Sequence, residues 1–250
     1  MPEPKPYQPK TQINLFGREL NVLDLSRELS EDMPVYPGHM KTAFWWHLTH
    51  EECRLRLGDT PFEGYAVRGI VTCDHVSTHV DAVFHFNKHR PDLTVDAIPL
   101  DYMITPALWV DVSFVPPRTH ITLKHLKEAI DRAGVSVKKG MTFMYYTGIS
   151  QKWNDPVAYV AQYPGLDGDA TDWILDQGVV NICTDAASTD NPADITYPNH
   201  TRHGQRLVIH TENIANMNLI PRHEGFYLAM FPLRLKGGTG CPVRALALWD

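Results

Sequence analysis

Three histidines and one aspartate, His75, His79, Asp81 and His85, stand within eleven consecutive residues of this 250-residue chain. Neutral imidazole and carboxylate groups are the usual ligands of a borderline divalent metal such as Zn²⁺ or Mn²⁺. A single buried histidine is more often an ordinary core residue, but this density of ligand-type side chains is costly unless an ion organises it. The string therefore indicates a metal site.

Neither a helix nor a straight strand brings all four side chains to one ion. On a helix His75 and His79 would share a face, but Asp81 would point elsewhere. On a straight strand all four would share a face, yet His75 and His85 would stand ~33 Å apart at ~3.3 Å per residue. Because metal–ligand distances are only ~2.0–2.2 Å, we expect this segment to curl.

The turn-capable residues Ser77 and Thr78 lie where this curl is required. His79 and Asp81 form the tightest pair of candidate ligands, and His75 is the next best candidate. A complete site needs further groups from elsewhere in the chain.

A second concentration of candidate ligands follows more than a hundred residues later and consists of His200, His203, His210, Glu212 and His223. Their spacing alone gives none of them priority over its neighbours.

The elements that must position these residues include more strands than helices. Strands are predicted over residues 21–29, 42–48, 65–71, 108–112, 141–146, 179–183, 226–232 and 243–249. Helices are predicted over residues 122–133, 169–177 and 212–217, the first with Thr122 as its N-cap and Gly134 as its stop. Residues 1–20 are interpreted as a loose N-terminal arm. Since no linker or repeat divides the rest, we expect one α/β domain over residues 21–250.

The composition is that of an ordinary globular protein, with 43% hydrophobic and 21% charged residues. A formal charge of −6 without a dense Lys/Arg run argues against a nucleic-acid or membrane partner. No apolar stretch approaches the ~20 residues that span a bilayer. The four cysteines stand far apart, and the Pro-rich start lacks an apolar signal region. We therefore expect reduced thiols and a cytoplasmic location.

The string His75-x-x-Thr78-His79-x-Asp81-x-x-x-His85-Phe86 resembles the signature of the metal-dependent cyclase family. That family includes kynurenine formamidases, isatin hydrolases and trans-dienelactone hydrolases. Residues 23–26 and 33–38 are similar to its opening blocks, and residues 212–214 and 240–245 to its closing blocks. The resemblance implies a compact swivelling β/β/α domain with mixed sheets and peripheral helices, and a homodimer or higher homo-oligomer.

The resemblance also implies a role for each matching residue. The first metal ligands of the family correspond to His75, His79 and Asp81, and its catalytic histidine corresponds to His85. His200 and Glu212 correspond to later ligands that two-metal members use, so we expect one or two ions of Mn or Zn. The chain departs from the family at Ser77, where glycine is usual, and at Val83, where proline is frequent. Because serine can adopt a turn, we expect the curl to survive.

Metal ligands beside a spare histidine favour hydrolysis by a metal-activated water. A bound divalent ion lowers the pKa of its water from 15.7 toward ~7 and polarises a substrate carbonyl. His85, with an unperturbed pKa of ~6.5, suits the transfer of the water proton to the leaving group. No Gly-x-Ser-x-Gly nucleophile elbow is present.

An aromatic-rich region before the string predicts contacts with a flat substrate from Trp46, Phe62 and Tyr65, although such residues also fill protein cores. Additional sequence around residues 151–168 makes the chain long for a kynurenine formamidase. We therefore predict hydrolysis of a small cyclic amide such as isatin, with trans-dienelactone hydrolase and arylformamidase activities as alternatives.

Two competing interpretations remain at this stage. His79, Asp81 and His200 also fit the two-histidine, one-carboxylate triad of non-haem Fe(II) oxygenases, although this leaves His75 and His85 without a role. A non-catalytic metal site would have a closed coordination sphere, and the spare His85 argues against it.

Overall fold

The computed structural model describes residues 7–250. Its strands are β1 (Lys10–Leu15), β2 (Arg18–Asp24), β3 (Ala43–Leu48), β4 (Val67–Val71), β5 (His79–Asp81), β6 (Ile104–Asp111), β7 (His120–Ile121), β8 (Thr142–Tyr146), β9 (Gly165–Leu166), β10 (Asn181–Thr184), β11 (Ile209–Glu212), β12 (Phe226–Pro232) and β13 (Gly240–Trp249). Its α-helices are α1 (His50–Leu57), α2 (Val83–Phe86), α3 (Leu123–Ala133), α4 (Pro156–Tyr159), α5 (Gly168–Asp176) and α6 (Pro198–Arg206). Short 3₁₀ helices cover Val95–Ala97, Leu100–Tyr102, Ile149–Lys152 and Met217–Leu219.

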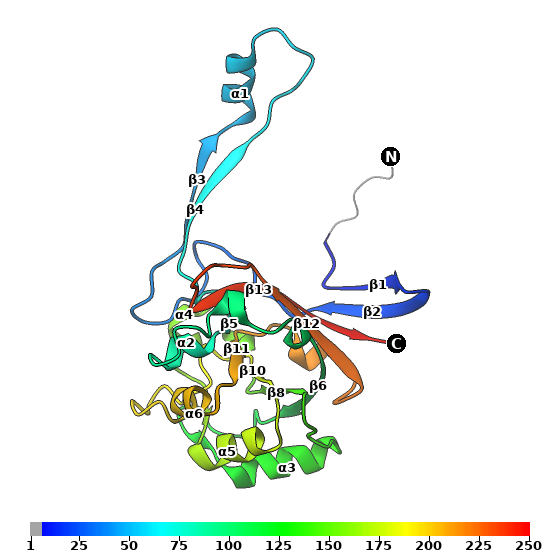
Figure 1. Ribbon diagram of the computed structural model, residues 1–250, viewed down its shortest axis with the longest axis vertical. Coiled ribbons are helices and arrows are strands. Elements are labelled where there is room, and N and C mark those ends of the chain that lie inside the picture. The colour runs from blue at the N-terminus through cyan, green and yellow to red at the C-terminus, as the bar shows by residue number, and fades with distance from the viewer. Residues whose placement is uncertain (1–6) are drawn as a thin grey trace.

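A barrel-like sheet forms the centre of the molecule (Figure 1). Its strand order is β1-β2-β13-β12-β6-β8-β10-β11-β5, and β13 also pairs with β5. This additional pairing closes the strands from β13 to β5 into a ring, from which β2 and β1 extend. The strands β6, β8, β10 and β11 are parallel neighbours, whereas the other pairs in this sheet are antiparallel. The predicted α/β class with mixed sheets and peripheral helices is therefore confirmed.

The parallel strands are buried on both faces, which explains their nearly continuous apolar runs. Phe143 and Tyr145 of β8 belong to the core cluster that includes α3 and α5. Met144 and Tyr146, which alternate with them, belong to the other large cluster, formed mainly with β12 and β13. This double-sided packing fixes the sheet on which the site is built.

Local signals place helix α3 where the sequence predicts a helix. The backbone N–H of His125 donates to Thr122 Oγ1 at 3.3 Å, and the backbone N–H of Thr122 donates to His125 Nδ1 at 3.3 Å. Leu126 and Ala129 face the core, and Gly134 ends the helix in the left-handed conformation. The N-cap and stop predicted for this helix are confirmed.

The prediction of a loose arm over residues 1–20 is wrong from Lys10 onward; residues 1–6 lie outside the described part of the chain. β1 and β2 form an antiparallel hairpin, and β2 pairs with β13. Phe16 and Gly17 both have positive φ (53° and 76°), as a two-residue hairpin turn requires. Phenylalanine rarely adopts this conformation, so the sequence carries no recognisable turn signal. The single domain over residues 21–250 stays a prediction.

The helix predicted over residues 212–217 is also absent. Glu212 ends β11, and Asn213 and Asn216 take left-handed conformations with φ of 59° and 53°. A right-handed helix cannot contain such residues, whereas asparagine tolerates them. The apolar residues of this segment instead enter the core individually.

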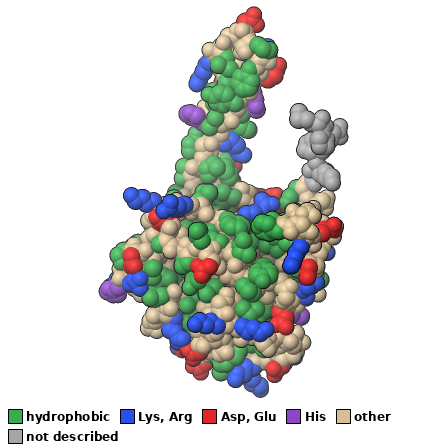
Figure 2. Space-filling model, turned by 45° about the vertical axis from the view of Figure 1, so that its right-hand side comes forward, with side chains coloured by type: hydrophobic (Ala, Val, Ile, Leu, Met, Phe, Trp, Pro, Cys, Tyr) green, Lys and Arg blue, Asp and Glu red, His purple; other side chains and the backbone are tan. Residues whose placement is uncertain are grey.

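Residues 43–71, here called the protruding arm, extend away from the barrel (Figure 1). β3 and β4 pair only with each other in a separate two-stranded sheet, and α1 lies beyond them. Apolar side chains follow the arm along the face seen in Figure 2. Among the described residues, no helix is both long enough and apolar enough to cross a membrane.

Candidate metal centre

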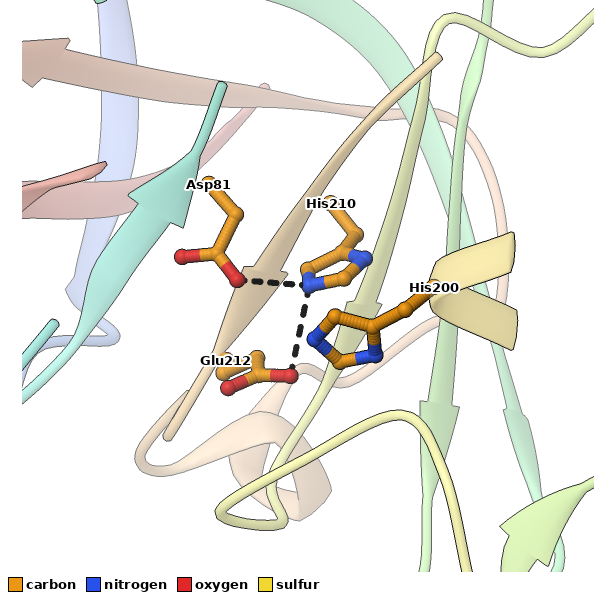
Figure 3. Close-up of side chains that lie close together, drawn as sticks. All are labelled: Asp81, His200, His210 and Glu212. Carbon is orange, nitrogen blue, oxygen red and sulfur yellow. Dashed lines mark hydrogen bonds and ion pairs between the residues drawn. The ribbon is translucent and has the colours of Figure 1, made fainter. Parts of the chain in front are cut away.

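The neighbouring antiparallel strands β5 and β11 carry the centre of the site. His79 and Asp81 of β5 stand opposite Glu212 and His210 of β11, respectively. Because side chains alternate along a strand, these four groups project from the same face of the pair. His200 reaches toward them from α6, as Figure 3 shows. The sheet register thus assembles residues that are far apart in sequence.

The first ligand group consists of His75, His79 and Asp81, whose candidate ligand atoms all lie within 4.8 Å of one another. Nδ1 of His75 is 2.7 Å from Asp81 Oδ1, and Nε2 of His79 is 3.2 Å from the same oxygen. All three side chains are buried. The structure therefore brings together the three residues that the sequence predicts as the first ligands.

The curl before β5 depends on Ser77, whose φ of 55° lies in the left-handed region. Its hydroxyl donates to the Arg27 carbonyl at 2.8 Å, and its own carbonyl accepts from Asn213 Nδ2 at 2.7 Å. The same carbonyl lies 3.0 Å from His79 Nδ1, so His79 donates through Nδ1 and keeps Nε2 for the site. Serine thus maintains the predicted curl at a position where glycine would be less strained.

The second ligand group consists of Asp81, His200, His210 and Glu212, again with candidate ligand atoms within 4.8 Å of one another. Nε2 of His210 lies 2.7 Å from Asp81 Oδ2 and 3.3 Å from Glu212 Oε1 (Figure 3). Asp81 belongs to both groups. The predicted later residues His200 and Glu212 are therefore in place, and His210 joins them.

His200 is held in position by a buried carboxylate. Its Nδ1 lies 2.6 Å from Asp190 Oδ2, and the backbone N–H of His200 donates to the same oxygen at 3.1 Å. The imidazole therefore donates through Nδ1 and keeps Nε2 for the site. The backbone N–H of Asn199 donates to Asp190 Oδ1 at 2.7 Å, which anchors this carboxylate at the start of α6.

His210 is the site residue that sequence reasoning failed to single out. The spacing His210-x-Glu212 repeats the spacing His79-x-Asp81 and would have placed both side chains on one face of a strand. The helix predicted from Glu212 concealed this signal. Of the other candidates, His203 is buried beside His210, whereas His223 lies against the Trp109 carbonyl and lines a different cavity.

His85 lies beside the ligands on the one-turn helix α2. Its Nε2 is 3.9 Å from Asp81 Oδ2, beyond hydrogen-bond distance, and its ring centroid is 4.0 Å from that of His75. Its side chain is 27% exposed, and it lines the cavity described below. Burial lowers the pKa of His85 to about 4, below the ordinary histidine value of ~6.5. Its imidazole is therefore neutral at neutral pH.

The charges of the centre attract a cation. Burial lowers the pKa of His79 and His210, but the adjacent Asp81 carboxylate raises them more, to about 9 and about 10. Burial raises the pKa of Asp81, yet the surrounding imidazoles hold it well below its ordinary value. Buried carboxylates that draw protons onto neighbouring imidazoles would equally draw a divalent ion. This set of imidazole and carboxylate donors fits Zn²⁺ or Mn²⁺.

A cavity of about 360 Å³ opens onto both ligand groups and His85. Its aromatic lining residues are Tyr36, Phe86 and Tyr197. The volume falls within the ~300–1,000 Å³ range of small-molecule sites. The arrangement can therefore hold a small flat substrate next to the candidate metal ligands.

The predicted substrate-binding residues Trp46, Phe62 and Tyr65 do not line this cavity within one chain. They belong to the protruding arm, where they are 60%, 52% and 53% exposed. Within one chain the structure therefore places them away from this cavity, and their contact with a substrate stays a prediction. An aromatic-rich sequence marks an apolar surface, but it does not say whether that surface faces a pocket or solvent.

The geometry also bears on the oxygenase alternative. His79 and His200 fall into different ligand groups, which share Asp81. The particular triad of His79, Asp81 and His200 that this alternative names is therefore not found as one set among the described residues.

Comparison with known proteins identifies the family. A family model described as "Putative cyclase" matches residues 23–191, and the chain belongs to this cyclase family. A kynurenine formamidase from Salinibacter ruber is 30% identical over 229 residues, covering 90% of this chain and 96% of that protein. An isatin hydrolase from Roseibium aggregatum is 25% identical over 205 residues, covering 76% of each protein.

A solved structure shows the same fold. Isatin hydrolase A from Ralstonia solanacearum superposes with a TM-score of 0.80 at 22% identity, covering 92% of each chain. The family resemblance predicted from the sequence is confirmed.

Proposed function

We propose that this protein is a metal-dependent hydrolase that opens a small cyclic amide of the isatin type. The observation that carries this proposal is the cavity lined by both ligand groups and by His85. A divalent ion held by these ligands would supply an activated water, whose pKa falls from 15.7 toward about 7, and would polarise the substrate carbonyl.

The first ligand group would hold an ion with side chains that are already oriented. His79 is oriented by the Ser77 carbonyl. Nε2 of His75 lies 2.9 Å from Thr239 Oγ1, which restrains that ring while its Nδ1 faces Asp81. Because these contacts exist before substrate binds, little reorganisation is required at the moment of reaction.

His85 moves the proton. Its neutral imidazole accepts a proton from the attacking water and then delivers it to the leaving amide nitrogen. Stacking against His75 limits rotation of the ring. Its side chain faces the cavity without being hydrogen-bonded to the protein among the described residues, so it is free for substrate chemistry.

Aromatic residues of the cavity hold a flat ring. Phe86 and Tyr36 offer ring surfaces, and the hydroxyl oxygens of Tyr36 and Tyr197 lie 3.3 Å apart. Burial, together with the hydrogen bond to Tyr197, raises the pKa of Tyr36 well above its ordinary value. Its hydroxyl therefore keeps its proton at neutral pH and can donate to a substrate carbonyl.

Arylformamidase activity is the second candidate, supported by the 30% identity to a protein named kynurenine formamidase across nearly all of that protein. An N-formyl arylamide contains the same functional groups as isatin, namely an activated amide carbonyl beside an aromatic ring. Trans-dienelactone hydrolysis is the third candidate, from the sequence resemblance alone.

The test is a substrate screen with metal-loaded protein. Purified protein is loaded with Zn²⁺ or Mn²⁺ and assayed with isatin, N-formylkynurenine and a dienelactone, without oxygen, 2-oxoglutarate or ascorbate. Isatin opening that is abolished by a chelator and restored by metal supports the first candidate. Turnover of N-formylkynurenine alone replaces it with the second. Turnover of no amide or lactone, or turnover that requires oxygen, overturns the hydrolase proposal.

A homo-oligomer that contacts through the protruding arm is also proposed. A two-stranded sheet is only marginally stable in water on its own. This one exposes large apolar residues of both strands, including Trp46 and Ile70. A second copy of the chain is the occupant we favour. Trp46, Phe62 and Tyr65 could then contact substrate only from a partner's arm. The cytoplasmic location and the lack of a nucleic-acid partner stay predictions.

A further inference from the structure

We propose that His210 is itself a metal ligand, so that the second group binds an ion through two imidazoles and two carboxylates. The proposal rests on the proposed function only in requiring that this centre binds a cation. It adds a ligand that neither the family resemblance nor the residue spacing assigns.

The first argument is the position of the ring. His210 is fully buried, and its register opposite Asp81 fixes the two backbones as direct neighbours. Nε2 of His210 lies between two carboxylate oxygens, 2.7 Å from Asp81 Oδ2 and 3.3 Å from Glu212 Oε1. An ion bound by those two oxygens would therefore have this nitrogen within reach as a further donor.

The second argument is the pattern of protons around the ring. A metal-binding imidazole coordinates through the nitrogen that carries no hydrogen, and its other nitrogen donates its N–H to a neighbouring acceptor. His203 can supply that partner. Its Nδ1 lies 2.8 Å from the Val208 carbonyl, which can only accept, so His203 carries its hydrogen on Nδ1 and has a bare Nε2.

Two buried ring nitrogens, one on each of these histidines, lack a hydrogen-bond partner among the described residues. They are His203 Nε2 and His210 Nδ1. The two rings are neighbours, with centroids 4.8 Å apart and planes at 85°. A small ring rotation or one bridging water would join the acceptor of His203 to the donor of His210. That pairing leaves Nε2 of His210 bare and directed at the carboxylates. His203 is thus its positioning residue.

The third argument is the division of Asp81 between the two groups. Oδ1 faces His75 at 2.7 Å, whereas Oδ2 faces His210 at the same distance. One carboxylate therefore offers a separate oxygen to each group, which suits a bridge between two ions. Since two imidazoles favour a borderline ion over a hard one, the second position should prefer Zn²⁺ to Mn²⁺.

The experiment measures metal binding rather than activity. Metal-free wild type, His210→Gln and the surface control His89→Ala are titrated with Zn²⁺ by calorimetry, and bound metal is measured by mass spectrometry after dialysis. Circular dichroism checks that each variant is folded. Wild type and the control should bind two ions per chain. His210→Gln should retain one ion and bind the other about 100-fold more weakly or not at all.

Two further measurements keep the proposal testable if His210→Gln does not fold. In cobalt-loaded wild type, proton NMR should show shifted exchangeable N–H signals from four ligand imidazoles, those of His75, His79, His200 and His210. His203→Leu should weaken the second ion about 10–100-fold, and His203→Gln, which keeps an acceptor, should restore most of that affinity.

The outcomes separate this inference from the hydrolase proposal. Unchanged binding of two ions by His210→Gln, a wild type that binds one ion, or only three shifted imidazole signals overturns the role of His210. Each of these results leaves hydrolysis by a centre with the first ligand group possible. Failure of wild type to bind any divalent ion overturns both.

Discussion

The imidazole ring of His75 occupies the space that a side chain at Gly240 would need. A Cβ at residue 240 would lie 2.5 Å from His75 Cε1 and 2.7 Å from His75 Nδ1. Gly240 also pairs with Asp81 in the β13–β5 ladder, so the separation of the two backbones is fixed. The position of the candidate ligand His75 therefore depends on Gly240, which lies 165 positions later in the chain.

Gly240→Ala should consequently displace His75 and weaken the ion of the first group. We expect a loss of about 10–100-fold in Zn²⁺ affinity, comparable to the loss of a residue that orients a metal ligand. Calorimetric titration measures it, and circular dichroism checks that the barrel persists. In a His75→Ala background, the added Gly240→Ala substitution should cause no further loss. An affinity for Zn²⁺ equal to that of wild type in the single variant would refute this reading of Gly240.

His85→Ala should separate catalysis from metal binding. Because His85 lies 3.9 Å from the nearest Asp81 oxygen and belongs to neither ligand group, metal content should stay at the wild-type level. The loss of acid–base catalysis should lower kcat by about 10²–10⁴-fold. Steady-state kinetics and metal analysis of the same sample test both parts, with His89→Ala as the control. Loss of metal in this variant would make His85 a ligand.

Asp190→Asn should act through His200. The amide can still accept from the Nδ1–H of His200 but offers no negative charge, so the ring is held less firmly. We expect about 10–100-fold weaker binding of the second ion and unchanged binding of the first. Asp194→Asn, a change to a carboxylate outside both ligand groups, is the control. Equal weakening by both variants would point to a general change in charge.

Stability should depend on pH in opposite ways with and without metal. The pKa values of His79 and His210, about 9 and about 10, exceed their ordinary value of ~6.5. Their protonation therefore stabilises the metal-free fold fully below about pH 6.5, and this contribution is lost as the pH rises through 9 to 10.

Calorimetric scans of metal-free protein should thus show Tm falling between pH 6.5 and 10. Metal binding requires neutral imidazoles, so uptake should release protons and strengthen as the pH rises through the same interval. A metal-free Tm that increases from pH 6.5 to 10 would contradict the assignment of charge to this pair.

The protruding arm should determine the oligomeric state. Trp46→Ser, Phe62→Ser and Tyr65→Ser in one chain remove three apolar side chains that are more than half exposed. Light scattering after size-exclusion chromatography should show that wild type is a dimer or larger and that the triple variant dissociates. Phe231→Ser, at a residue of similar exposure on β12, is the control. A wild-type monomer, or a triple variant of unchanged mass, would exclude the arm as the contact.

Local signals in the sequence predict much of the fold. Helix α3 follows from Thr122 and Gly134, and β12 occupies the range predicted for a strand over residues 226–232. The predictions that failed concern features that depend on contacts between residues far apart in the sequence. The hairpin that turns at Phe16 is continued by the pairing of β2 with β13. Trp46 is exposed on an arm whose strands, among the described residues, pair with each other and with no strand of the main sheet.

In the candidate site, too, the residues that are close in sequence could be predicted, whereas those that depend on strand pairing could not. His75, His79 and Asp81 could be predicted because their types and spacing are local, and Ser77 was expected to keep the curl. The choice among the later histidines required the register of β5 against β11. His210 and Glu212 share a face only when both lie on one strand. The prediction of a helix that begins at Glu212 therefore hides this pair.

The pairing of Asp81 with His210 joins residues 129 positions apart. Closing so long a loop is entropically slow, and the antiparallel contact between β5 and β11 cannot form before the chain between them has largely condensed. The second ligand group is therefore complete only after this contact has formed, whereas the first group is local in sequence. An ion bound by the second group would enter a barrel that is already assembled, and its binding energy would act mainly by slowing unfolding rather than by guiding the chain toward its fold.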